Sequence, residues 1–281
     1  MESFDEMLDS FIRLGLAEDV GEGDHTSMAC IRSTRVSKAK LLIKDDGIIS
    51  GVDVAKKIFK EVAAAADFEK LISDGSVVKP GDVAFYVTCP TRALLMAERL
   101  VLNTMQRMSG IATIASLYLQ EIEGLPVKIL DTRKTTPGMR FLEKQAVVHG
   151  GCHNYRAGLY DWIMIKDNHV EACGDIALAI DRVHEYLQKT QKDLSITIEV
   201  RNLVELQKVL DHGGVTRIMM DNFEIPILKE AVAMVGKRFE TEASGGIDLH
   251  NVRAYAETGV DYVSSGALTH SAGTMDMSLK I

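Results

Sequence analysis

The stretch Arg217-Ile218-Met219-Met220-Asp221-Asn222 is an apolar run that ends in a carboxylate and an amide. The same arrangement returns at Phe239 to Ala243, which leads into Ser244-Gly245-Gly246, and at Tyr262-Val263-Ser264, which leads into Ser265-Gly266. Short apolar runs bounded by polar and glycine residues are strand signals, and the stretches between them have helical length and pattern. Asp221 and Ser244 lie 23 positions apart, which is room for one strand, one helix and two short loops. The repeating unit is therefore βα and the predicted sheet is parallel.

Three earlier apolar runs end in the same manner. They are Val127 to Leu130 before Asp131-Thr132-Arg133-Lys134, Trp162 to Ile165 before Lys166-Asp167-Asn168-His169, and Ile196-Thr197-Ile198 before Glu199. In parallel sheets, and in barrels made from them, chemistry sits at the C-terminal ends of the strands. The six strand ends together therefore predict one candidate active site.

The length of the repeating part sets the size of the barrel. It runs from about Val127 to about Ser271 and holds six units, whereas a closed eightfold barrel typically needs about 250 residues. We therefore predict an α/β fold with an incomplete parallel α/β barrel of about six units in residues 116–271. Residues 1–115 are expected to form an N-terminal mixed α/β sandwich domain packed on the barrel, with the tail 272–281 as a candidate addition to it.

The first 115 residues predict both helices and strands. Apolar residues at helical spacing predict a helix over Phe4–Leu14. Thr91 is expected to cap a long helix that runs from Arg92 to about Met108 and is broken at Ser109-Gly110. Strands are expected over residues 39–43 and 47–51, and on both sides of a Pro-Gly turn within residues 76–87.

Composition narrows the class of protein. The 281-residue chain carries a formal net charge of −8, which argues against nucleic acid as its main partner. No stretch approaches the roughly 20 apolar residues needed to cross a bilayer, and the acidic start lacks the basic residues of a signal peptide. The four cysteines show no Cys-x-x-Cys spacing, as is typical of reduced thiols. We expect a cytoplasmic, soluble protein that binds neither nucleic acid nor membrane.

Arg133 and Lys134 stand side by side in a loop that continues with two threonines and a Pro-Gly pair. An arginine binds carboxylate or phosphate through two bonds and a lysine supplies a point charge, so the pair suits a polyanionic substrate. A solvated charged turn is the alternative.

Lys166 follows four apolar residues directly, a position where an unpaired ammonium is costly to bury. Two functions compete for it, an anion-binding cation and a Schiff-base nucleophile. The residues that follow, Asp167, Asn168 and His169, do not decide between them.

Glu199 and Asp221 end two consecutive runs of the predicted sheet. Neighbouring parallel strands would bring their carboxylates to within roughly 5–10 Å of each other. Two carboxylates that face a phosphate-rich ligand usually hold Mg²⁺, although helix capping or salt bridging is the alternative for each.

Ser244-Gly245-Gly246 and Ser265-Gly266 are similar to the glycine-rich turns of the last barrel strands, where backbone N–H groups hold a phosphate. His149 and His153 have a spacing of four, but Gly150-Gly151 lies between them and argues against one helix and a shared metal.

Arg99, Asn103 and Arg107 lie on one stripe of the predicted long helix. A solvated face is the default for such a stripe, although a helix at a subunit junction could also lend an arginine to a site.

Taken together, these residues resemble the quinolinate phosphoribosyltransferase family over nearly the whole chain. The most diagnostic stretch is Asp131 to Gly138. The other matching stretches are Glu18-Asp19 to Thr26, Glu98-Arg99 to Thr113, Gly150 to Leu159, Ile165 to His169, Glu199-Val200, Met220-Asp221-Asn222, Ala243 to Ile247 and Ser265 to Ser271.

The resemblance implies an N-terminal sandwich on an incomplete α/β barrel and a homodimer whose active sites lie at the subunit junction. It implies that Arg99 reaches the partner's site, and that Arg133 and Arg156 hold the substrate carboxylates. Lys134 and Lys166 are then expected to face both quinolinate and phosphoribosyl pyrophosphate. The phosphate region matches Ser244, Gly245, Gly246, Ser265, Gly266 and His270.

One position departs from the family. The family usually has histidine just before the second arginine, and this chain has Tyr155 before Arg156, with a histidine at His153 instead. Tyrosine donates one hydrogen bond but carries no positive charge near neutral pH. We therefore hypothesise that Tyr155 or His153 is the donor to a ring carboxylate, and that Tyr155→His improves affinity if the lost cation matters.

The resemblance implies phosphoribosyl transfer to quinolinate with decarboxylation, which gives nicotinate mononucleotide, pyrophosphate and CO₂ in de novo NAD biosynthesis. Mg²⁺ is the implied metal, held by Glu199 and Asp221 partly through water or substrate, and no organic cofactor is needed. The predicted catalytic residues are Lys134, Lys166, Glu199 and Asp221. The alternatives are a Schiff-base lyase that uses Lys166, and a non-catalytic or different-acceptor relative on the same fold.

Overall fold

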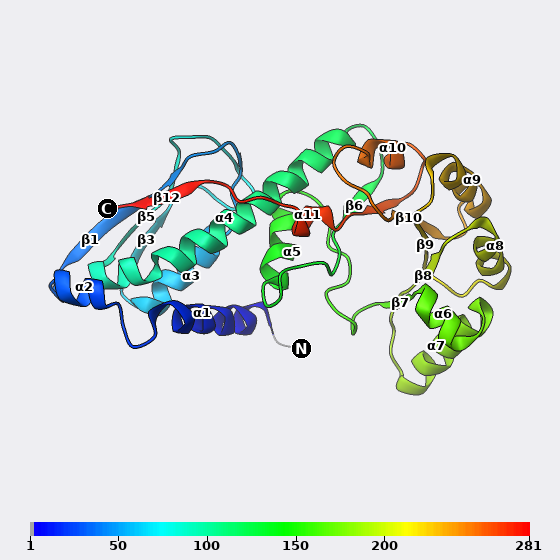
Figure 1. The fold of residues 1–281 in the computed structure, drawn as a ribbon, viewed down its shortest axis with the longest axis horizontal. Helices are drawn as coiled ribbons and strands as arrows, with labels where there is room; N and C mark the ends of the chain where they lie inside the picture. The colour runs from blue at the N-terminus through cyan, green and yellow to red at the C-terminus, as the bar shows by residue number, and fades with distance from the viewer. Residues whose placement is uncertain (1–2) are drawn as a thin grey trace. The chain divides into compact units, whose positions relative to one another are not determined.

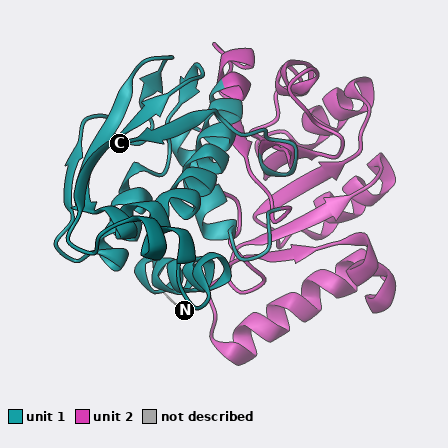
Figure 2. Cartoon of the chain, turned by 60° about the vertical axis from the view of Figure 1, so that its left-hand side comes forward, with its two compact units in different colours: residues 1–116, 135–151, 269–281 teal, residues 117–134, 152–268 magenta. Residues whose placement is uncertain are grey.

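The computed structural model describes residues 3–281 and divides into two compact units (Figure 2). The first unit holds the chain up to Ser116 together with Thr135–Gly151 and Thr269–Ile281, and the second holds Leu117–Lys134 and Cys152–Leu268. In the first unit, the C-terminal strand β12 (Met277–Lys280) pairs with β1 (Val36–Ile43), as suggested for the tail. Residues 135–151 also belong to the first unit, although the sequence assigned them to the barrel.

A six-stranded parallel sheet forms the centre of the second unit (Figure 1). Its spatial order is β6-β11-β10-β9-β8-β7, and every neighbouring pair is parallel. The predicted strands and the incomplete six-unit barrel are confirmed. The strands are β6 (Lys128–Leu130), β7 (Ile163–Ile165), β8 (Ile196–Val200), β9 (Arg217–Asp221), β10 (Glu240–Ser244) and β11 (Tyr262–Ser264).

Helices connect these strands, and two of them begin with an acidic or amide side chain that caps the helix. Asp175 accepts from the Ala177 N–H at the start of α7, and Asn202 accepts from the Glu205 N–H at the start of α8. Asn202 follows β8 after one residue and so allows a tight β8–α8 turn, whereas Asp175 lies between α6 and α7. The helices of this unit are α6 (Asp167–Cys173), α7 (Ile176–Thr190), α8 (Leu203–His212), α9 (Ile225–Val235) and α10 (Val252–Ala256).

The sheet is open between its edge strands β6 and β7, and an irregular segment, residues 152–161, lies along the β6 edge. The His153 N–H donates to Ile129 O at 2.9 Å, and the Asp131 N–H donates to His153 O at 3.1 Å. This forms a single parallel bridge between Leu130 and His153. The segment therefore satisfies part of the exposed strand edge in place of a further strand.

The first unit is built on a four-stranded antiparallel sheet of order β12-β1-β5-β3. Phe59, Phe68 and Phe85 pack in its core with ring centroids 4.5–6.2 Å apart. The remaining elements are α1 (Phe4–Val20), α2 (His25–Cys30), β2 (Gly47–Ile48), α3 (Val52–Val62), β3 (Asp67–Lys70), β4 (Val77–Val78), β5 (Val83–Pro90) and α5 (Arg140–His149).

The expected strand–turn–strand over residues 76–87 exists, but its two strands do not pair with each other. β4 pairs with β2, whereas β5 pairs with β1 and β3. The turn between them uses Gly81 at φ +98°, a conformation that favours glycine. The turn therefore moves the chain from one sheet to another.

The predicted break of the long helix at Ser109-Gly110 is wrong, because α4 (Thr91–Glu121) continues through both residues. A Cβ at Gly110 would lie 2.0 Å from the carbonyl oxygen of Gly273, so glycine allows a close approach of two backbone segments. The Ser109 hydroxyl accepts from the Ser50 N–H and donates to Ser50 O. The Ser109-Gly110 pair therefore lets α4 pack closely against the segments that contain Ser50 and Gly273.

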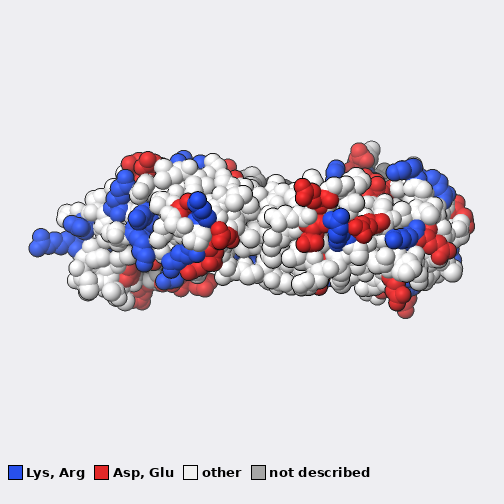
Figure 3. All heavy atoms as spheres, turned by 90° about the horizontal axis from the view of Figure 1, so that it is seen from above, with Lys and Arg blue, Asp and Glu red and all other residues white. Residues whose placement is uncertain are grey.

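The charged residues on the face seen in Figure 3 include both signs, and acidic side chains interrupt the basic ones there. Within residues 3–281, the helices are all too short or too polar to cross a membrane.

Candidate functional site

A cavity of about 540 Å³ lies in the second unit, at the C-terminal ends of the parallel strands. Ten predicted residues meet in it: Arg133, Lys134, Tyr155, Arg156, Lys166, Glu199, Asp221, Ser244, Gly245 and Gly246. They come from loops or strand ends that are far apart in the chain, and parallel strand order brings them together.

The cavity has five further lining residues that the sequence analysis missed: Thr132, Met164, Met219, Asn222 and Ser264. Three of them could have been found, because side chains alternate along a strand and Met164, Met219 and Ser264 each lie two positions before a predicted site residue. The two methionines give the cavity an apolar wall among its charges.

Lys166 and Glu199 form an ion pair on neighbouring strand ends, with 2.6 Å between Lys166 Nζ and Glu199 Oε2. The Glu199 side chain is only 9% exposed, while Lys166 remains 43% exposed. Lys166 thus places a fixed positive charge at the cavity wall. That geometry favours an anion-binding cation over a Schiff-base nucleophile.

Asp221 and Ser244 are register partners on β9 and β10. The Asn222 Nδ2 donates to Asp221 Oδ2 at 2.6 Å, and the Asn222 N–H donates to Ser244 O at 2.8 Å. Asn222 adopts a left-handed conformation at φ +56°, and a Cβ at Gly245 would lie 2.3 Å from Asn222 Oδ1. Glycine is therefore required where these two turns meet.

The acidic residues fit a metal only in part. Among residues 3–281, no three His, Cys, Asp or Glu side chains gather as a ready metal site. Glu199 and Asp221 offer two carboxylates at adjacent strand ends. Mg²⁺ is commonly held by one or two carboxylates together with phosphate oxygens and water, so this donor set fits a magnesium ion that arrives with a phosphate ligand.

Arg133 and Arg156 are two further cations in the cavity lining, and their charges interact. Burial lowers the pKa of the Arg156 guanidinium, and the charge of Arg133 lowers it further. Two cations close enough to repel favour a dianion between them. Arg156 also donates to the carbonyl of Trp162 at 3.4 Å.

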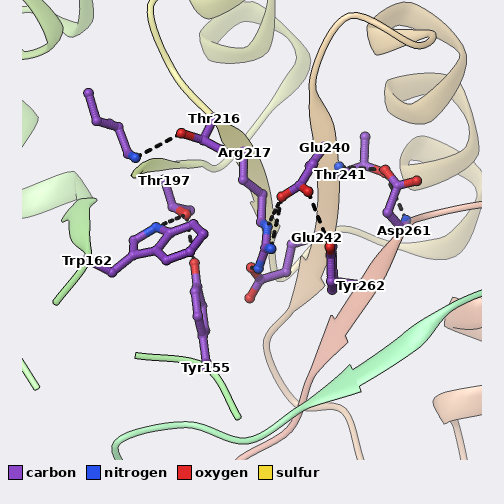
Figure 4. A network of polar contacts seen from close by, with 11 residues as sticks. Tyr155, Trp162, Thr197, Thr216, Arg217, Glu240, Thr241, Glu242, Asp261 and Tyr262 are labelled. Carbon is purple, nitrogen blue, oxygen red and sulfur yellow. Dashed lines mark hydrogen bonds and ion pairs between the residues drawn. The ribbon is translucent and has the colours of Figure 1, made fainter. Parts of the chain in front are cut away.

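The Tyr155 hydroxyl is directed to Thr197 at 2.7 Å, and the Trp162 Nε1–H donates to the same Thr197 oxygen at 2.8 Å (Figure 4). Thr197 is fully buried and does not line the cavity. Burial raises the pKa of the Tyr155 hydroxyl, so the group stays protonated. Tyr155 therefore meets the cavity through its ring, and the hypothesis that its hydroxyl donates to a ring carboxylate loses its geometric basis.

Several predicted residues do not line the cavity. Ser265 is 1% exposed, and its hydroxyl donates to Ile247 O at 2.6 Å and bonds with the Tyr118 hydroxyl at 3.0 Å. A phosphate contact through the Ser265 side chain is not compatible with this arrangement. His153 is exposed and lines a different, smaller hollow of about 280 Å³.

The remaining predicted residues outside the cavity lining are Gly266, which follows β11, Arg99, which is exposed on α4, and His270, at the end of α11 (Ala267–His270). Arg99 and His270 belong to the first unit. The His270 ring bonds with the Ser271 hydroxyl at 2.7 Å.

His149 and His153, which the sequence analysis did not expect to share a metal, lie on different elements. His149 ends α5 and its Nδ1 lies 2.7 Å from the Ser50 hydroxyl, while His153 belongs to the segment beside β6.

Two family models match the chain. Residues 111–280 match the C-terminal domain of quinolinate phosphoribosyl transferase, and residues 24–109 match the N-terminal domain of the same family. The two matches together cover most of the sequence.

Relatives agree with the family models. The chain is 43% identical over 289 residues to Quinolinate phosphoribosyltransferase (decarboxylating) 1 of Nicotiana glauca, a match that covers 98% of this chain and 82% of that protein. It is 38% identical over 264 residues to a probable nicotinate-nucleotide pyrophosphorylase (carboxylating) of Bacillus subtilis, covering 94% and 90%. The crystal structure of NadC from Streptococcus pyogenes superposes with a TM-score of 0.93 at 33% identity, covering 100% of this chain and 98% of that one.

Proposed function

Since the chain belongs to the quinolinate phosphoribosyltransferase family, we propose that the protein catalyses, in this cavity, the transfer of a phosphoribosyl group from phosphoribosyl pyrophosphate to quinolinate. Quinolinate loses a carboxylate in this reaction, and the products are nicotinate mononucleotide, pyrophosphate and CO₂. The observation that carries the proposal is one cavity that combines four cations with two carboxylates. A dianionic acceptor and a polyphosphate donor need this combination.

Quinolinate fits the side of the cavity that holds Arg133, Lys134 and Arg156. The two carboxylates of the acceptor would pair with the two guanidiniums and relieve their mutual repulsion. Its flat ring would lie against the apolar wall made by Met164, Met219 and the ring of Tyr155. Shape and charge thus agree with an aromatic dicarboxylate.

Phosphoribosyl pyrophosphate fits the side formed by Lys166, Glu199, Asp221 and the Ser244–Gly246 turn. Backbone N–H groups of a glycine turn and the Ser244 hydroxyl suit the 5′-phosphate. Glu199 and Asp221 would hold Mg²⁺ together with phosphate oxygens, and when bound this ion neutralises the leaving pyrophosphate.

The chemistry follows from these charges. The bond between ribose C1 and the pyrophosphate oxygen breaks, and the carboxylates of Glu199 and Asp221 stabilise the positive charge that develops on the ribose. The ring nitrogen donates its lone pair to C1 and becomes a pyridinium. The adjacent carboxylate then leaves as CO₂, its bonding electrons pass to the pyridinium ring, and a proton replaces it. Arg133 and Arg156 hold the acceptor in line for the attack.

A homodimer is part of the proposal, because Arg99 is exposed on the first unit and is not among the residues that line the cavity. By the family resemblance, Arg99 would enter the partner's site. Mixing equal amounts of Arg99→Ala and Lys166→Ala subunits tests this, because each mixed dimer regains one intact site of two. About half of the dimers are mixed, so the sample should recover about a quarter of wild-type activity. Mixed samples that remain inactive would contradict a shared site.

We propose the cytoplasm as the site of action. Relatives include a chloroplastic protein in Arabidopsis thaliana and a mitochondrial one in Nicotiana tabacum, so the family is not confined to one compartment. Cell fractionation with an antibody to the native chain decides the location.

The decisive assay incubates purified protein with quinolinate, phosphoribosyl pyrophosphate and Mg²⁺, and quantifies nicotinate mononucleotide by chromatography. Product should vanish when any one of the three is omitted, and chelation of Mg²⁺ by EDTA should be reversible. A folded protein that binds phosphoribosyl pyrophosphate but forms no product would refute quinolinate as the acceptor. Lys166→Met is the matched inactive control.

A further inference from the structure

The second unit holds a polar cluster centred on a buried arginine, and its aromatic side chains are half-buried and line the smaller hollow of about 280 Å³ (Figure 4). We use the name Arg217 cluster for Arg217, Glu242, Tyr155, Thr197, Trp162 and Tyr262. Because side chains alternate along strands, Arg217 lies two layers below Asp221, and Glu242 lies one layer below Ser244. The cluster therefore supports the cavity without being part of its charged rim.

Arg217 is the centre of the cluster and is only 6% exposed at its side chain. Its guanidinium donates to Glu242 Oε2 at 3.2 Å and to Glu240 Oε2 at 2.9 Å. Glu242 is fully buried, whereas Glu240 is 41% exposed. If Arg217 is lost, water can therefore solvate the Glu240 carboxylate but not the Glu242 carboxylate.

Three aromatic rings surround the same guanidinium. Its carbon lies 3.7 Å from the ring centroid of Tyr262 and 5.2 Å from each of the centroids of Tyr155 and Trp162. These are cation–π distances, and the rings of Tyr155 and Trp162 also meet edge to face at 5.7 Å. Arg217 thus contacts the ring of Tyr155 from below.

Tyr155 depends on such contacts because it lies on the irregular segment 152–161. The backbone bridge of that segment to the sheet is made at His153, and the Tyr155 N–H donates to Asp131 Oδ1 at 2.8 Å. The direction of the side chain is then set by Thr197 and the Glu242 carboxylate, which both bond with its hydroxyl, and by the guanidinium of Arg217.

We propose that Arg217, held by Glu242, is a positioning residue that fixes the ring of Tyr155 as the wall for the acceptor's aromatic ring. The inference rests on the proposed function, since it assigns the acceptor half of that same site. Arg217 does not touch substrate in this proposal. Its loss should weaken quinolinate binding and leave the binding of phosphoribosyl pyrophosphate unchanged.

The same contacts explain why this chain has tyrosine at position 155, where the family usually has histidine. A histidine at position 155 lacks the hydroxyl that bonds with Thr197 and Glu242, and a histidine cation would also stand about 5 Å from the Arg217 guanidinium. Tyr155→His should therefore raise the KM for quinolinate, which reverses the sign expected from sequence. In the Arg217→Met background, the same substitution should be tolerated better.

The test compares four variants. They are the single variants Arg217→Met and Arg217→Lys, the double variant that combines Arg217→Met with Glu242→Gln, and the control Asp261→Asn. The Asp261 carboxylate accepts from the Thr241 N–H and hydroxyl, on the opposite face of β10 from Glu242. Asp261→Asn therefore loosens the same strands without contact to Tyr155. The double variant removes both buried charges and should therefore fold even if Arg217→Met alone does not.

We expect Arg217→Met to raise the KM for quinolinate about tenfold, with the KM for phosphoribosyl pyrophosphate and kcat within about threefold of wild type. Arg217→Lys should recover part of the loss, and Asp261→Asn should lower Tm while both KM values stay near wild type. Trp162 is the chain's single tryptophan, so quenching of its emission by quinolinate, without phosphoribosyl pyrophosphate, gives Kd directly.

A quinolinate KM that stays within about twofold of wild type in every folded Arg217 variant would overturn the inference while leaving the function intact. Equal increases of both KM values would indicate a merely structural role and overturn it as well. A wild-type protein that forms no nicotinate mononucleotide would instead refute the proposed function and this inference with it.

Discussion

Replacing Arg107 by methionine should destabilise the first unit strongly. Glu143 is completely buried, and its Oε1 accepts from Arg107 Nε at 2.9 Å and from the Thr136 hydroxyl at 2.7 Å. Arg107 also donates to the carbonyl oxygens of Thr269 and Ala272 at 2.6 and 2.7 Å. One arginine thus ties α4, α5 and the C-terminal segment of the first unit together.

The magnitude follows from what remains after the change. Arg107→Met leaves the Glu143 carboxylate buried without its cation, and removing one partner of a buried pair costs about 3–5 kcal/mol. In a chain of this length each kcal/mol lowers Tm by roughly 2 °C, so Tm should fall by about 6–10 °C. The double variant Arg107→Met with Glu143→Gln should recover at least half of the loss, because glutamine carries no charge and still accepts from Thr136.

Thermal unfolding followed by circular dichroism measures the effect, with Arg201→Met as the matched control. Arg201 pairs with Glu205 at i, i+4 on the surface with 56% of its side chain exposed, so its loss should leave Tm close to that of wild type. A Tm for Arg107→Met within about 1 °C of wild type, or a double variant less stable than the single one, would refute the reasoning.

Gly245→Ala should lower the free energy of unfolding by about 2–4 kcal/mol, since φ at Gly245 is +98° and the added Cβ would lie 2.3 Å from Asn222 Oδ1. Urea unfolding measures the loss, and a decrease below about 1 kcal/mol would contradict the prediction. The KM for phosphoribosyl pyrophosphate should rise in the same variant. Burial raises the pKa of the Cys152 thiol to about 12, so its thiolate is scarce between pH 7 and 9 and iodoacetamide should label exposed Cys30 while sparing Cys152. Peptide mass mapping after labelling checks this, and modification of Cys152 in folded protein at the rate of Cys30 would contradict it.

Several features of this protein could be predicted because they are local in the chain. A short apolar run followed by polar residues identifies a parallel strand and its C-terminal end, and strand ends meet at one edge of the sheet. Arg133, Lys166, Glu199 and Asp221 meet in one cavity for that reason. Alternation along the strands also places Met219 beside them.

The sequence by itself thus determined the βα repeat and the main charges of the site, whereas contacts between distant segments were decided by tertiary structure. Ser109-Gly110 has the composition of a helix break, yet the close approach of Gly273 explains it within a continuous helix. Arg107 lies on a stripe expected to be solvated, and only the position of Glu143 on α5 makes it a buried ion pair.

The Arg217 cluster shows the same limit at the site. Arg217 opens β9 and Glu242 lies 25 positions later, so nothing local joins them until β9 and β10 become neighbours in the sheet. Tyr155 arrives from an irregular segment with no periodicity to reveal its direction. Periodicity predicts which face of an element a residue occupies, but the partner across that face depends on strand order and on side-chain packing.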